Sequence, residues 1–125
     1  MIYYYNKLVR DKIPENIDKI EGRKASWRIL NDDEYKKELD KKLIEEIHEF
    51  IEEHDIEELA DVMEVIETIM KVENIQIEEV KEKQMMKRKK KGGMDDKIYL
   101  KFVEEDERNI EEERKLNKSW RKTSK

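Results

Sequence analysis

The 125-residue sequence contains no cysteine, one proline and three glycines. The absence of cysteine excludes disulfide bonds, thiolate catalysis and cysteine metal sites. It is also typical of a reducing compartment, so we expect a cytoplasmic protein. With so little proline and glycine, the sequence gives poor support to Gly-rich phosphate loops and to β architectures with many turns. The composition therefore favours an all-α protein.

Long apolar runs are missing as well. No stretch approaches the roughly 20 apolar residues that cross a bilayer, and the N-terminal residues show neither the apolar core nor the cleavage site of a signal peptide, so we expect none. Charged residues make up 49% of the chain and hydrophobic residues 36%, with a net charge of −5. Because the two signs nearly cancel and the apolar residues recur periodically, we expect a folded chain.

The small net charge conceals two blocks of opposite sign. Residues 43–70 include eleven acidic residues and no lysine or arginine, whereas residues 83–91 include six basic residues and no acid. Charge blocks of this kind indicate the chemistry of a partner. We expect that no cation of the protein competes for the acidic residues of the first block, which leaves them available to a metal ion.

The sequence predicts one domain over residues 1–103, followed by a polar helix or tail over residues 104–125. Near the N-terminus, Asp11 is a candidate N-cap of a short helix that Gly22 can end. Near the end of the domain, residues 97–103 predict a short extended segment.

Two long helices are predicted at about residues 32–53 and 56–73, with Asn31 or Asp32 as the first N-cap. Their short connection indicates an antiparallel pair. Apolar residues form a stripe along each helix, centred on Ile47 in the first and on Leu59 in the second. A third helix at about residues 76–91 ends at two glycines.

The helix pair carries two acidic pairs at the same offset from the apolar stripe, at about 100° per residue on a helical wheel: Glu46 with Glu49, and Glu58 with Asp61. Four carboxylates that converge at a packing edge make a hard-oxygen site suited to Mg²⁺ or Mn²⁺. Such a site can hold phosphate oxygens and activate a water. The alternative is a solvated acidic face, because glutamate is a strong helix former. We interpret the acids nearer the outer face as solvated surface residues; these are Glu45, Glu52, Glu57 and Glu64.

The third helix turns from apolar to basic along one face, because Ile77, Val80, Lys87 and Lys91 lie on the same side of the wheel. Lysines beside an acidic metal site suit a polyphosphate substrate. The alternative is a solubilising or nucleic-acid-binding patch. The basic block has no interleaved aromatic residue, which argues against sequence-specific nucleic-acid recognition.

These motifs resemble those of the MazG-like all-α nucleoside-triphosphate pyrophosphohydrolases. The resemblance rests on EExxE at residues 45–49 and ExxD at residues 58–61. The flanking YNKLVRDKIPE and KRKKKGGMDDKIYLKFVE are similar to the phosphoribosyl-ATP pyrophosphohydrolase-like subgroup of that family. Together the similar segments cover most of residues 3–103.

The resemblance implies an oligomeric helical bundle and Mg²⁺-dependent hydrolysis of the bond between the α and β phosphates of a nucleotide, which releases a monophosphate and pyrophosphate. It implies metal ligands at Glu46, Glu49, Glu58 and Asp61, and a supporting or water-orienting role for Glu45. Lys87 and Lys91 match basic residues that contact phosphates. Lys7, Arg10 and Lys12, in the LVRDKIP segment, either reach a phosphate or pair with the acids. Trp27 and Tyr35 are candidates for stacking on the base, or are ordinary core or interface aromatics.

Two other functions stay open. A non-catalytic helical module would use the acidic block to dock a basic partner. A di-iron carboxylate bundle would use a Glu-x-x-His pair, for which Glu45 and His48 supply one half, although a second pair is missing. The small apolar content also predicts that the helix pair completes its core with a second copy, as a homodimer or a dimer of dimers.

Overall fold

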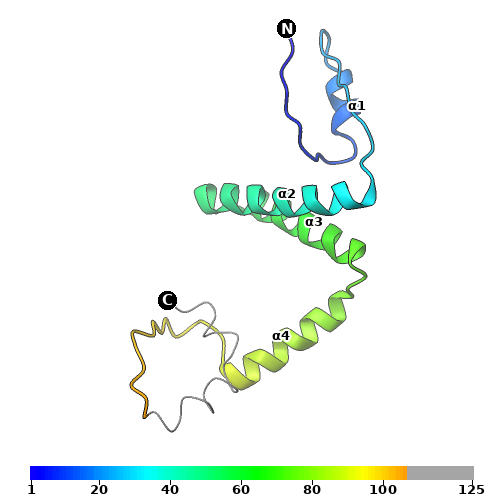
Figure 1. Ribbon diagram of the computed structural model, residues 1–125. Helices are drawn as coiled ribbons and strands as arrows, with labels where there is room; N and C mark the ends of the chain where they lie inside the picture. The colour runs from blue at the N-terminus through cyan, green and yellow to red at the C-terminus, as the bar shows by residue number, and fades with distance from the viewer. Residues whose placement is uncertain (107–125) are drawn as a thin grey trace. The chain divides into compact units, whose positions relative to one another are not determined.

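The computed structural model describes residues 1–106, and this part of the chain is all-helical, as the composition predicts. Its elements are α1 (Ile13–Asp18), α2 (Asp32–Glu53), α3 (Ile56–Val72) and α4 (Ile77–Lys91) (Figure 1). The chain divides into two units, Met1–Lys89 and Lys90–Lys125. Within the described residues, no helix is long and apolar enough to cross a membrane. Most of the predicted polar tail, residues 107–125, lies outside the described residues.

Helix α2 begins at a capping box, a reciprocal pair of side-chain caps. The Asn31 side chain accepts a hydrogen bond from the Glu34 backbone N–H at 2.9 Å, and the Asn31 N–H donates to the Glu34 carboxylate at 3.2 Å. The Arg28 guanidinium donates two further hydrogen bonds to the same carboxylate. These bonds from Arg28 and then from Asn31 lower the pKa of Glu34 to about 2. The predicted bounds of α2 are confirmed.

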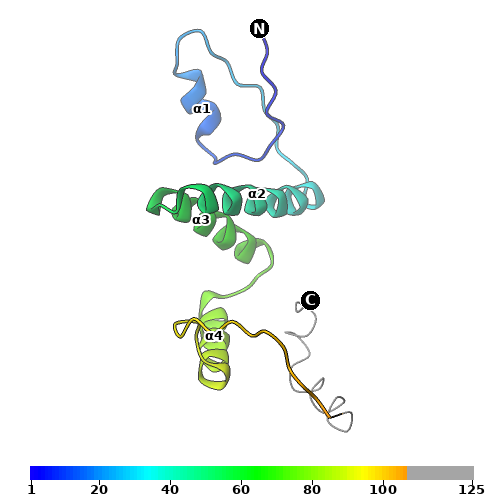
Figure 2. The same cartoon turned by 90° about the vertical axis from the view of Figure 1, so that its left-hand side faces the viewer.

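A two-residue connection joins α2 to α3. His54 takes a left-handed backbone conformation with φ 52°, and Asp55 caps α3 by accepting a hydrogen bond from the Glu58 N–H at 2.8 Å. The chain therefore reverses, and α3 runs back alongside α2 in both views (Figure 2). The predicted antiparallel pair is confirmed.

The core of this pair is small, since the buried apolar side chains of the described residues are Leu39, Val62 and Val65. Ile47 stays 40% exposed and Leu59 46% exposed, so the predicted centres of the two buried stripes are wrong. One neighbouring helix covers only part of a wide apolar stripe. The uncovered part of the stripe includes Ile44, Ile47 and Ile51 on α2, and Ile56, Leu59 and Met63 on α3.

The short N-terminal helix differs from its prediction at both ends. Lys12 rather than Asp11 is the N-cap, and α1 ends at Asp18 instead of continuing to Gly22. The Asp18 carboxylate accepts a hydrogen bond from the Ala25 N–H at 2.7 Å, which turns the chain back immediately after the helix. A local side-chain bond to the backbone thus replaces further helical turns.

Helix α4 agrees with its prediction to within one residue, and Gly92 follows it with φ +85°. None of its side chains is buried. Residues 97–103, predicted to be extended, contain neither helix nor strand.

Candidate metal centre

The most unusual side chain of the helix pair is Glu46, a carboxylate in the middle of α2 with 6% of its surface exposed. The Lys42 ammonium, one turn earlier on the same helix, lies 3.1 Å from its Oε1 atom. Its Oε2 atom is buried and has no hydrogen-bond partner among the described residues. Burial raises the pKa of Glu46 in spite of the opposing effect of Lys42. A buried and half-satisfied carboxylate is costly unless a cation completes it.

Glu58 brings a second carboxylate of this kind from the first turn of α3. Its Oε2 atom is likewise buried without a hydrogen-bond partner in the described part of the chain. Burial raises the pKa of Glu58, and the negative charges of Glu49, Asp55 and Asp61 raise it further. These influences come from both helices, which places the carboxylates of the pair in one electrostatic cluster.

The cluster consists of two overlapping groups that share Glu46. In each group, one potential ligand atom per residue lies within 4.8 Å of the others. The members are Glu45, Glu46 and Glu49 in the first group, and Glu46, Glu58 and Asp61 in the second. The structure thus brings together the four acids of the two predicted pairs and Glu45, to which the resemblance gave a supporting role, and we call these five residues the acidic cluster. Carboxylate oxygens in this arrangement suit a hard divalent cation.

No histidine belongs to either group within the described residues, and His48 is exposed. The Glu-x-x-His pair that motivated the di-iron alternative is therefore not assembled here.

The expectation that no protein cation competes for these acids is wrong. Lys7 Nζ lies 3.0 Å from Glu45 Oε1, Arg10 Nη2 lies 2.8 Å from Asp61 Oδ1, and Lys42 pairs with Glu46. These cations come from outside the acidic block, from the N-terminal segment and from the residue just before Leu43. A block without lysine or arginine in sequence can still be surrounded by them in space.

Of the four acids that the wheel placed on the solvated outer face, Glu52, Glu57 and Glu64 are exposed, as predicted, whereas Glu45 is half-buried. Lys7 and Lys42 both approach the Glu45 carboxylate, and hydrogen bonding by Lys7 is the main reason that its pKa is lowered. Glu64 Oε1 lies 3.8 Å from Arg10 Nη1. Both acids therefore contact the N-terminal segment.

Four other candidate residues are not members of the acidic cluster. Lys87 and Lys91 are exposed on α4, and neither forms an ion pair or hydrogen bond with a cluster residue within residues 1–106. Lys91 belongs to the unit that begins at Lys90. Trp27 is 64% exposed, whereas Tyr35 is half-buried at the start of α2. The roles of these four residues stay predictions.

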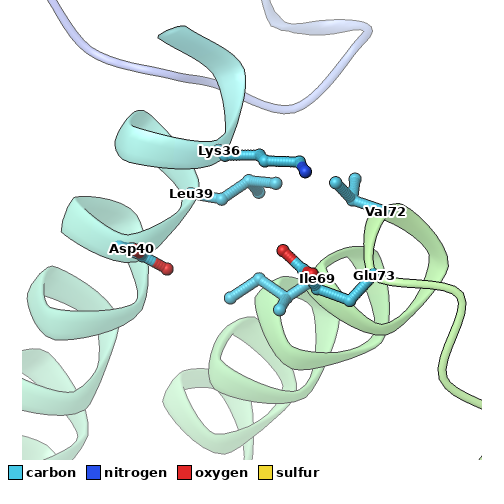
Figure 3. A pocket seen from close by; sticks show the side chains of 6 residues that line it. All are labelled: Lys36, Leu39, Asp40, Ile69, Val72 and Glu73. Atoms are coloured by element: carbon cyan, nitrogen blue, oxygen red, sulfur yellow. The ribbon is translucent and has the colours of Figure 1, made fainter. Parts of the chain in front are cut away.

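A small hollow lies at the opposite end of the helix pair from the α2–α3 connection. The side chains that line it come from the first turns of α2 and the last turns of α3 (Figure 3), and are Lys36, Leu39, Asp40, Ile69, Val72 and Glu73. Its volume of about 30 Å³ is far below the roughly 300 Å³ or more of a typical small-molecule site. This hollow therefore does not hold a nucleotide.

Sequence reasoning overlooked two members of the site, Lys42 and Asp55. Lys42 stands four residues before Glu46, the spacing at which side chains of a helix meet, and this was the available signal. Asp55 follows a helix and precedes an apolar run, which is typical of an N-cap.

Comparison with known proteins adds no relative. No family model matches the chain, and neither a curated protein nor a solved structure matches it.

Proposed function

We propose that this chain is a divalent-metal-dependent nucleotide pyrophosphohydrolase. Its substrate is a nucleoside triphosphate or a related nucleotide, and water cleaves the bond between the α and β phosphates to give a monophosphate and pyrophosphate. The resemblance of the EExxE and ExxD motifs and their flanking segments to those of MazG-like enzymes supports the reaction. The acidic cluster supports the need for a metal, with Mg²⁺ preferred and Mn²⁺ as the alternative.

One observation carries the proposal. The Glu46 side chain is more than nine-tenths buried, and its Oε2 atom has no partner in the described part of the chain although four other carboxylates surround it. An acidic face that is only solvated leaves its carboxylates in water, where they need no partner. A buried carboxylate oxygen without a donor, by contrast, fits a metal ligand.

The metal would be held by Glu46, Glu49, Glu58 and Asp61, while Glu45 orients water from its place beside Glu46. A bound divalent ion supplies charge neutralisation at the phosphates and a more acidic water. Basic side chains would offset the remaining charge of the polyphosphate. In this proposal Lys87 and Lys91 take that role, as the resemblance implies, and Lys7 and Arg10 add to it.

The test is release of pyrophosphate from a panel of nucleotides, with and without Mg²⁺. Glu58→Gln removes one negative charge from the cluster and should abolish the metal-dependent release. Glu57→Gln is the matched control, because Glu57 is the preceding residue of α3 and is exposed. Failure of the wild-type protein to release pyrophosphate with every nucleotide and metal would overturn the proposal and favour a non-catalytic interaction module.

The active form in this proposal is a homodimer or a dimer of dimers. Its support is the row of exposed apolar side chains on the helix pair, spaced three and four residues apart on each helix: Ile44, Ile47, Ile51, Ile56, Leu59 and Met63. Apolar surface at helical spacing with nothing packed on it is typical of an interface. The same face of a second copy, related by two-fold symmetry, would cover this apolar surface.

A further inference from the structure

Residues 1–12 contact the helix pair through two charged side chains, Lys7 and Arg10. This N-terminal segment contains no helix, strand or buried residue. Among the described residues, the hydrogen bonds between the segment and α2 or α3 are those of Lys7 with Glu45 and of Arg10 with Asp61. Both acceptors belong to the acidic cluster, and Arg10 also lies 3.8 Å from Glu64 outside it, so the cluster is the main anchor of the segment.

Two of the cations that contact the cluster, Lys42 and Arg10, differ in how strongly they are held. The Lys42 and Glu46 side chains are 17% and 8% exposed, which protects their ion pair from water. The Arg10 and Asp61 side chains are 55% and 38% exposed. An exposed ion pair contributes little net free energy and exchanges readily. Of these two pairs, the one with Arg10 therefore yields more easily to a competing cation.

We propose that the N-terminal segment is a metal-sensitive strap: Lys7 and Arg10 hold it on the acidic cluster in the metal-free protein, and a divalent ion bound by the cluster displaces Arg10 from Asp61. This inference rests on the proposed metal centre. Five carboxylates of the cluster face three contacting cations, Lys7, Arg10 and Lys42. The excess charge of −2, when all five are ionised, matches one divalent ion.

Two physical effects drive the exchange. A divalent ion would bind the carboxylate oxygen of Asp61 that otherwise accepts a hydrogen bond from the Arg10 guanidinium. Its double positive charge also repels a guanidinium a few ångströms away, and the repulsion is strong where burial lowers the local dielectric. Because the segment has no buried residue of its own, the exposed pair of Lys7 with Glu45 is the main contact that keeps it on the helices once Arg10 is displaced.

The first test measures the affinity of the metal-free protein for Mn²⁺, from the electron paramagnetic resonance signal of the free ion. Competition predicts that Arg10→Gln binds Mn²⁺ about two- to fivefold more tightly, a range set by the small stability of exposed pairs. Lys12→Gln is the matched control, because it removes the same charge from the same segment, and Lys12 forms no ion pair within residues 1–106. Arg10→Gln binding no more tightly than Lys12→Gln would overturn the strap.

The second test follows the segment itself. Since the chain has no cysteine, Tyr4→Cys and Glu67→Cys introduce the only thiols, both at exposed positions, for a pair of spin labels. With labelled chain diluted into unlabelled chain, Mg²⁺ should change the distance distribution toward that of the metal-free Lys7→Gln/Arg10→Gln variant. An unchanged distribution at saturating Mg²⁺ would refute displacement.

The outcomes separate the two proposals. If the wild-type protein binds neither Mn²⁺ nor Mg²⁺, both the proposed metal centre and the proposed strap are refuted. If the wild-type protein binds the ion and Arg10→Gln binds it no more tightly than its control, only the strap is refuted.

Discussion

Lys42 Nζ lies 3.1 Å from Oε1 of Glu46, while Oε2 of the same carboxylate has no partner among the described residues. The two residues are four positions apart on α2, so the pair forms within one helix and needs no distant segment. One side of the buried carboxylate is thus neutralised by the protein, and the other side stays available. This division explains how Glu46 is tolerated in the helix pair without a metal and can still act as a ligand.

Replacement of Lys42 should expose the cost of that buried charge. Lys42→Met leaves the Glu46 carboxylate buried without a cation, and we expect the free energy of unfolding of the metal-free protein to fall by about 1–3 kcal/mol. Urea denaturation measures the change, and saturating Mg²⁺ should recover part of it by supplying the missing charge.

The neighbouring residue offers the control for this experiment. Lys41 is 75% exposed and pairs with Glu38 at 3.0 Å, so Lys41→Met should change the free energy of unfolding by less than about 0.5 kcal/mol. Equal losses for the two variants would show that Glu46 gains nothing from Lys42.

The raised pKa values of Glu46 and Glu58 predict opposite pH dependences for folding and for metal binding. Between the ordinary carboxyl value of 4.5 and their raised values, the native state binds more protons than the unfolded state. The stability contribution of these two groups therefore decreases as pH rises through that window. Metal binding needs ionised carboxylates, so affinity for Mn²⁺ increases over the same window.

Glu46→Gln separates the two dependences. The glutamine keeps the shape of the side chain and carries no charge, so the metal-free variant should be more stable than the wild type above the window and should bind Mn²⁺ weakly at every pH. Denaturation and Mn²⁺ titration at a series of pH values from 4.5 upward measure both. A wild-type affinity that is flat with pH would argue against Glu46 as a ligand.

Glu34 should behave in the opposite sense at lower pH. Its pKa is lowered to about 2 by Arg28 and by the cap at Asn31, so its contribution to stability is present above the unfolded value of 4.5 and is lost as pH falls toward 2. Glu34→Gln retains a capping side chain at the same helix position. The difference in unfolding free energy between wild type and Glu34→Gln should therefore shrink between pH 4.5 and 2, and a constant difference would contradict the assignment.

Local signals in the sequence were sufficient to predict the helices of the pair. Asn31 as an N-cap, acids in the first turn and apolar spacing located α2 to the residue, because caps and periodicity act within a few positions of one another. The same periodicity placed Glu46 beside Glu49 and Glu58 beside Asp61. It also implied that the two acidic pairs converge, because a short connection makes the helices antiparallel.

Distances along the chain explain what the sequence could not predict. The sequence left open whether Lys7 and Arg10 pair with the acids or reach a phosphate. Their partners lie 38 and 51 residues away, so the choice depends on the path of the whole N-terminal segment. The predicted centre of the buried stripe on α2 was wrong for a related reason. Spacing shows which residues share a face, but the neighbouring helix decides which part of a wide face is covered, and it covers Leu39 rather than Ile47.

The uncovered apolar face leads to a prediction about assembly. If two copies pack through it, Ile44→Glu places a charge in the interface, and light scattering should show a shift from dimer to monomer. Full burial of an isoleucine contributes about 1.5–3 kcal/mol, and Ile44 has 59% of its surface left to bury. Two-fold symmetry counts that contribution twice, so the dissociation constant should increase by at least about twentyfold.

The stability of each separate chain should change little in this variant, because Ile44 is 59% exposed in the helix pair. Lys41→Glu is the control, since it introduces the same side chain into α2 at an exposed position outside the apolar row. A wild-type protein that stays monomeric at every concentration, or a dimer that tolerates Ile44→Glu as well as Lys41→Glu, would place the interface elsewhere. Either result would leave this apolar row to a different partner.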